Sequence, residues 1–265
     1  MLNSLLFPPQ TNEVQFDEKW SFSGKKEKNC NPEDPGDEDC GDIWDHIAFD
    51  PENRLVICVI PGKRTAKNTR KLVKEFKRRT GGKTMRLITT DMYKPYIEAI
   101  LAEYGIIIRP TSTGKRGRPR KPQRVPKPGL TYAMVKKHLK RGKIAKVETE
   151  IIFGTQKDVD AALKKSKASK RINTAFIERQ NGTDRNRNSR KARKTLCFSK
   201  RREEHDAMTY FTLYSYNFCW PVRTLKLKDN WGERSSPRTP AMSAGLTDHV
   251  WTVKEWVNFP VVQCT

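Results

Sequence analysis

The chain has 265 residues, of which 53 are lysine or arginine and 30 are aspartate or glutamate, so its formal net charge is +23. A surplus of that size attracts polyanions, and nucleic acid is the first candidate because no apolar run is long enough to span a membrane. The apolar stretch at residues 1–7 is too short and too uncharged for a secretory signal, so we expect a cytoplasmic protein.

The first 108 residues have the pattern of a sheet covered by helices. Short apolar runs and apolar–polar alternation predict strands, and an N-capping residue or a leading proline marks the start of each helix. The order β-β-β-α-β-α-β indicates the α/β or α+β class with a mixed sheet. The expected strands are 14–22, 43–49, 55–60, 85–90 and 106–108, and the expected helices are 65–80 and 95–105.

The composition changes after residue 108. No acidic residue lies between Glu103 and Glu148, and prolines recur. We interpret residues 109–154 as an inserted basic arm between the fourth and fifth strands and the last catalytic helix. We expect residues 131–138 and 143–153 to form a hairpin within it.

Residues 115–122, with the sequence KRGRPRKP, resemble an AT-hook. Proline and glycine keep such a backbone extended, so its arginines can enter a narrow A·T minor groove. The alternative is a flexible basic linker that touches phosphates without sequence preference. The DNA contacts expected from this segment are Arg116, Arg118, Arg120 and Lys121.

A long basic helix is expected at 173–194, between helices at 155–165 and 202–218. No acidic residue lies between Asp184 and Glu203. Seven residues are almost two helical turns, so Glu178 and Arg185 share a face. A metal-binding carboxylate and several cations on one face of a helix could contact successive phosphates of a DNA strand that runs along it. The expected contacts are Arg185, Arg187, Arg190, Lys191, Arg193 and Lys194.

Asp17 and Asp91 are candidate metal ligands because both lie at strands expected in the middle of the sheet. Two-metal phosphodiester chemistry needs rigidly held carboxylates, with the ions about 3.5–4 Å apart. Neighbouring strands can supply two of them and a helix the third. An aspartate at a strand end is more often a turn or cap residue. The two aspartates therefore support a metal site only when Glu178 is considered with them.

Three segments resemble the catalytic motifs of bacterial insertion-sequence transposases of the IS-one type. They are FDEKWSF (16–22), ITTDMYKPY (88–96) and FIERQNGTDRNRNSRKARKTLCFSK (176–200), and the resemblance covers about residues 13 to 220. It implies a retroviral-integrase/RNase H-like fold and a catalytic, metal-binding DDE triad of Asp17, Asp91 and Glu178 with two Mg²⁺ or Mn²⁺ ions. It also implies cleavage and strand transfer of double-stranded DNA by a homo-oligomer at the bacterial nucleoid.

This interpretation divides the chain into parts. Residues 1–108 and 155–220 would form the catalytic domain, interrupted by the arm at 109–154 and followed by a tail at 221–265. Transposases of this type usually carry an N-terminal region that reads the element's ends, and here Asp17 comes too early for one, which leaves open whether a separate chain recognises the ends. Two alternatives stay open: an RNase H-like nuclease that does not join strands, and a non-catalytic basic DNA-binding protein derived from a truncated transposase.

Overall fold

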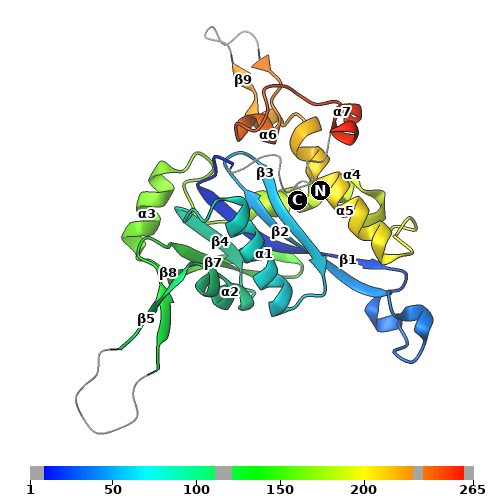
Figure 1. Ribbon diagram of the computed structural model, residues 1–265, viewed down its shortest axis with the longest axis horizontal. Helices are drawn as coiled ribbons and strands as arrows, with labels where there is room; N and C mark the ends of the chain where they lie inside the picture. Colours follow the sequence, from blue (N-terminus) through cyan, green and yellow to red (C-terminus); the bar gives the residue numbers. More distant parts are fainter. Residues whose placement is uncertain (1–8, 111–120, 229–234, 260–265) are drawn as a thin grey trace, which may run out of the picture.

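A six-stranded mixed sheet forms the centre of the protein in a computed structural model, which describes residues 9–110, 121–228 and 235–259 (Figure 1). The strand order is β3-β2-β1-β4-β7-β8. The first three strands form an antiparallel meander, β4 and β7 run parallel to β1, and β8 returns antiparallel to β7. This sheet confirms the expected mixed α/β class. Its strands are β1 (Glu13–Ser23), β2 (Gly41–Asp50), β3 (Leu55–Gly62), β4 (Leu87–Asp91), β7 (Tyr132–Lys140) and β8 (Lys143–Phe153).

Helices pack on both faces of the sheet, so residues of β1 alternate between two environments. Phe16 points into a core shared with α1 and α2, where it stacks on Tyr96 with ring centroids 5.6 Å apart. The opposite face carries a second core shared with α4 and α5. In the described ranges no helix is long and apolar enough to cross a membrane. The helices are α1 (Ala66–Arg79), α2 (Pro95–Tyr104), α3 (Gln156–Lys165), α4 (Ala175–Arg187), α5 (Arg202–Cys219), α6 (Pro240–Ser243) and α7 (Val253–Asn258).

The strand expected at 106–108 forms, but it lies outside the main sheet. It is β5 (Gly105–Ile108), which pairs with β6 (Gln123–Pro126) in a separate ribbon, and Figure 1 shows β5 extending away from the sheet. β5 follows α2 without a loop, so no residues are left to bring it back to the sheet edge. The place beside β4 is taken by β7, whose first four residues are apolar and buried, as a strand covered on both faces requires. The hairpin expected in the arm is therefore part of the main sheet.

The basic helix expected at 173–194 ends earlier, at Arg187. The side chain of Asn188 accepts a hydrogen bond from the backbone N–H of Arg190 at 3.1 Å, a local bond that competes with continuing the helix. A single 3-10 turn, η3 (Ser189–Lys191), follows and directs Lys191 into the protein, where its ammonium lies 2.5 Å from Asp45.

Candidate active site at the ends of β1 and β4

Asp17 and Asp91 lie side by side on neighbouring parallel strands. The last paired residues of β1 and β4 are Phe16 and Thr90, so the next position on each strand is an aspartate. Carboxylate oxygens of Asp17, Glu18 and Asp91 all lie within 4.8 Å of one another. Asp91 is held by the backbone N–H of Tyr93, which donates to Oδ1 at 3.0 Å. We call Asp17, Glu18 and Asp91 the acidic cluster.

Glu18 was not expected in this cluster, because the alternation of β1 points it to the other face of the sheet. It is buried, and Nη2 of Arg64 lies 3.1 Å from its Oε2 and 3.7 Å from Oδ2 of Asp91. Because β4 ends at Asp91, no backbone separates the two faces at this point. The adjacent acidic pair at positions 17 and 18 was the signal in the sequence that could have found it.

The cluster disfavours full ionisation of its carboxyl groups. Burial raises the pKa of Asp17 to about 7, and the negative charge of Asp91 adds to this shift. Burial likewise raises the pKa of Glu18 to about 7 and raises the pKa of Asp91. A cation held between the three carboxyl groups would favour their ionised forms.

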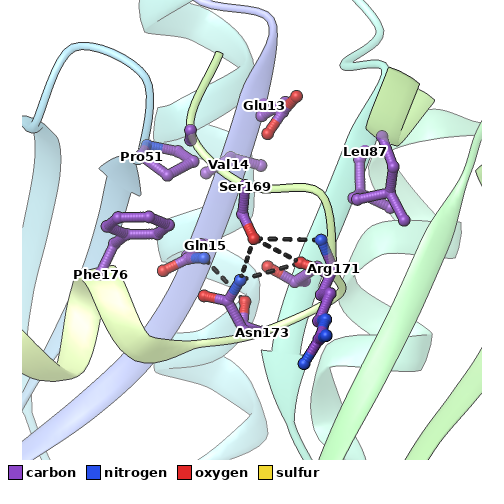
Figure 2. Close-up of a pocket in the computed structure, with 12 residues that line it drawn as sticks. Glu13, Val14, Gln15, Pro51, Leu87, Ser169, Arg171, Asn173 and Phe176 are labelled. Carbon is purple, nitrogen blue, oxygen red and sulfur yellow. Dashed lines mark hydrogen bonds between the residues drawn. The ribbon is translucent and has the colours of Figure 1, made fainter. Parts of the chain in front are cut away.

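The N-terminus of α4 is fixed on β1 by Gln15, two residues before Asp17 on the same face. Its side chain donates to the carbonyl of Asn173 at 2.7 Å and accepts from the backbone N–H of Ile177 at 2.9 Å. Figure 2 shows the segment that enters α4 beside Gln15, with Ser169, Arg171 and Asn173 joined by hydrogen bonds. The first turn of α4 therefore has a defined position over the strand.

The next two turns of α4 are fixed in the same way. Asn181 donates from its side-chain amide to Oδ2 of Asp17 at 2.8 Å, and the buried side chains of Lys19 and Asp184 form an ion pair. Asn181 was not among the expected site residues, although it stands three positions after Glu178 in the third motif. Its amide is the one side-chain donor to the Asp17 carboxylate in the described ranges.

Glu178 lies on α4 beside the acidic cluster but outside it. Its carboxylate is paired with the ammonium of Lys137 on β7 and accepts a hydrogen bond from Thr174 Oγ1 at 2.5 Å. Its charge contributes to raising the pKa of both Asp17 and Asp91, so it acts on the same space. The structure brings two of the three expected carboxylates together and places the third next to them, held by a lysine.

A buried ionic group lies beneath α4 and η3, on the side of β1 away from β4. Although burial opposes it, the ammonium groups of Lys191 and Lys19 hold the pKa of Asp45 below its usual range. Lys191 is only 4% exposed and is enclosed by Asp45 and Thr209. Lys191 is therefore unavailable to a DNA phosphate, which corrects its expected role as a DNA contact.

The other expected DNA contacts occupy different environments. Arg193, Lys194 and Lys121 are exposed, whereas Arg190 pairs with Glu204 at 3.4 Å. Arg187 stacks on Trp220, with its guanidinium carbon 4.2 Å from the ring centroid. Arg185 is partly buried on the same face of α4 as Glu178. Most of the AT-hook-like segment lies outside the described residues, and with it the expected contacts Arg116, Arg118 and Arg120.

Neither a protein-family model nor a curated protein sequence matches the chain. The case for a function therefore comes from the site itself. Carboxylate oxygens on a rigid sheet are the ligands that hard divalent cations such as Mg²⁺ and Mn²⁺ prefer. The acidic cluster of Asp17, Glu18 and Asp91 offers such oxygens within 4.8 Å of one another.

Proposed function

We propose that this chain is a DDE transposase of the insertion-sequence type, which cleaves and joins DNA strands with Asp17, Asp91 and Glu178 as its catalytic carboxylates. The observation that carries the proposal is the juxtaposition of Asp17 and Asp91 at equivalent positions of two parallel strands, with α4 bonded across β1 beside them. An RNase H-like fold is part of the proposal. It is supported by the antiparallel meander β1–β3, with parallel strands β4 and β7 on the other side of β1.

Asp17 and Asp91 would hold the metal ions, with Glu178 as the third ligand. When bound, two Mg²⁺ or Mn²⁺ ions supply the activation of water or a DNA 3′-hydroxyl and the stabilisation of the leaving oxygen. In the described protein the Lys137 ammonium neutralises Glu178 and Arg64 neutralises Glu18. Asp17, with its pKa raised to about 7, has to release a proton when it becomes a ligand.

Double-stranded DNA is the proposed substrate. The net charge of +23 provides the long-range attraction to DNA. Arg185 lies on the same face of α4 as Glu178, and Arg193 and Lys194 come after the end of that helix. Arg193 and Lys194 are exposed and Arg185 is partly exposed, so all three offer charge to DNA phosphates.

The test uses Asp91→Asn, which keeps the shape of the side chain and removes its charge. We expect cleavage and joining of DNA that carries the ends of the element to fall at least about a hundredfold in Mg²⁺ or Mn²⁺. The matched control is Asp248→Asn, because this aspartate is 94% exposed and distant in sequence from the cluster. Asp91→Asn should have a melting temperature no lower than that of the unmodified protein, and its DNA affinity should match that of the unmodified protein.

The products separate this proposal from its alternatives. A transposase gives joined strands, whereas a nuclease on the same fold gives cut strands alone. Full activity of Asp91→Asn would exclude the DDE mechanism. Unmodified protein that binds DNA but neither cuts nor joins it with metal would favour the non-catalytic binding protein.

A further inference from the structure

A cavity of about 410 Å³ lies on the flank of α4 opposite to the acidic cluster. The α4 residues that line it include Phe176, Arg179 and Thr183, at spacings of three and seven. Glu178, Asn181 and Arg185 have the same spacings, and at 3.6 residues per turn their stripe is nearly half a turn away. The cavity volume is in the range of about 300–1,000 Å³ that is usual for ligand sites.

The walls of the cavity combine aromatic rings with guanidinium groups. Four of the residues that line it are aromatic, three are arginines and none of those described is acidic. The aromatic residues are Phe49, Phe176, Tyr216 and Trp220, and the arginines are Arg54, Arg179 and Arg223. Trp220 is 48% exposed, so part of its ring is available for a further contact.

Two arginines stack on rings that line the cavity: Arg54, which lines it too, and Arg187, which lies behind Trp220. Arg54 lies 3.9 Å from the Phe176 ring centroid, and Arg187 lies 4.2 Å from that of Trp220. Within the described chain no carboxylate comes within ion-pair distance of Arg54, Arg179, Arg187 or Arg223. By contrast, Arg201, which precedes α5, and Arg202, its first residue, each pair with a carboxylate.

Two guanidinium groups beside the cavity, those of Arg54 and Arg187, are partly buried, and that of Arg54 donates to the carbonyl of Pro51. Burial lowers the pKa of both Arg54 and Arg187. The Nη1 atom of Arg187 is buried and has no hydrogen-bond partner in the described chain. A buried N–H without an acceptor is unfavourable, so the unpaired Nη1 of Arg187 and the arginines that line the cavity suit an anion that supplies oxygen acceptors.

A nucleotide matches both features of the cavity. Guanidinium groups bind phosphate oxygens in pairs, and a base stacks on an aromatic ring whatever its sequence. A base pair within a duplex has both faces covered by its neighbours, so only an unpaired base can present a face to Trp220. The cost of taking a base out of the stack is a few kcal/mol, and it is smallest where the base is already unpaired.

We propose that this cavity binds one unpaired nucleotide of a DNA strand, with its base on Trp220 and its phosphate on Arg179 and Arg223. The proposal rests on DNA being the substrate of the proposed function. An α-helix is about 10 Å across, so a strand bound at the acidic cluster can cross α4 and reach the cavity within a few nucleotides. The cavity would then hold a strand that has left the duplex next to the phosphate that reacts.

Binding is measured by fluorescence anisotropy in EDTA, so that no metal chemistry takes part. The probes are a paired duplex, the same duplex with one unpaired nucleotide, and one in which that nucleotide lacks its base. We expect the unmodified protein to bind the unpaired nucleotide at least about tenfold more tightly than the paired duplex. Trp220→Ala should remove this preference. The matched control, Phe211→Ala, should keep it, because Phe211 is 40% exposed on α5 and does not line the cavity.

The phosphate half of the site has its own variant. Arg223→Lys keeps the charge and removes the planar fork, so it should weaken binding of the probe without a base by about threefold or more. If Trp220→Ala does not melt cooperatively, Arg223→Lys still tests whether the cavity binds the nucleotide. The matched control is the same substitution at the exposed Arg70 on α1, as Arg70→Lys.

Equal affinity of the unmodified protein for the paired and unpaired probes would overturn the inference. A preference that survives in both Trp220→Ala and Arg223→Lys would do the same. Free adenosine monophosphate that binds while DNA shows no preference would assign the cavity to a mononucleotide instead. Loss of cleavage with the preference intact would refute only the proposed function, because the binding assay contains no metal.

Discussion

The side-chain amide of Asn181 on α4 donates to the carboxylate of Asp17 on β1 at 2.8 Å, one helical turn after Glu178. Residues three apart lie on the same side of a helix, so this bond sets the position of Glu178 relative to the strand. Gln15 anchors the turn before it and the buried Lys19–Asp184 pair anchors the turn after it. Three alternate residues of β1 thus hold three turns of α4, and a carboxylate on each element faces the same space.

Asn181→Ala should reduce metal-dependent cleavage by about 10- to 100-fold, as expected for loss of a residue that orients a metal ligand. A hydrogen bond to a carboxylate favours its charged form, so its loss raises the pKa of Asp17 further. The rising limb of the rate against pH should therefore move upward, which initial rates from about pH 6 to about pH 9 will reveal. The control is the exposed Asn186 on the same helix, as Asn186→Ala. A rate lowered equally at every pH would show that Asn181 acts only on folding.

Asp17→Asn should stabilise the metal-free protein, increasingly so as the pH rises. Burial raises the pKa of Asp17 from its ordinary value of 3.8 to about 7, so between these values the folded state holds a proton that the unfolded state has released. Raising the pH across this window therefore destabilises the unmodified protein. Denaturant unfolding in EDTA should show no difference between the two proteins near pH 4 and a gain on the order of 3 kcal/mol above pH 7. An equal gain from Asp39→Asn, an exposed site, would contradict this cause.

Lys137→Gln should increase the affinity of the site for Mn²⁺. The Lys137 ammonium pairs with Glu178, so a metal ion has to displace it before that carboxylate can bind. Partly exposed pairs contribute up to about 1 kcal/mol, and the gain in affinity should therefore be about two- to fivefold by titration calorimetry. Lys136→Gln, the exposed neighbour on the other face of β7, controls for the change in net charge. Unchanged or weaker binding in Lys137→Gln would mean that Glu178 is not a ligand.

Gly182→Ala tests whether α4 meets DNA at close range. A Cβ added at Gly182 would have no heavy atom of the protein within 4 Å, so the substitution fits the folded chain. Alanine is favoured over glycine inside a helix, and the free energy of unfolding should rise by about 1 kcal/mol. The same variant should lose affinity for DNA if a strand crosses α4 at this residue. Stability that falls would show that the helix interior is more crowded than its geometry indicates.

Local sequence signals predicted most of the elements, because each is encoded within a few residues. Thr65 caps α1 through the N–H of Asn68, and Thr155 with Asp158 forms the capping box of α3 as expected. The hairpin of β2 and β3 and the strand that ends at Asp91 also follow the predicted apolar pattern. These features need no knowledge of distant contacts, so the sequence is sufficient for them.

The placement of those elements was decided by contacts between residues far apart in the chain. Residues 106–108 and 132–135 are both short apolar runs, yet only the second enters the main sheet. The first belongs to β5, which follows α2 without a loop and cannot return to the sheet edge. Glu18 joins the acidic cluster only because β4 ends at Asp91, and Lys191 turns inward only because Asp45 is buried beneath it. The sequence by itself determined the residue types and local periods that make strands, helices and carboxylate motifs. The tertiary structure alone decided which side chains meet, since strand register and charge pairing depend on the whole sheet.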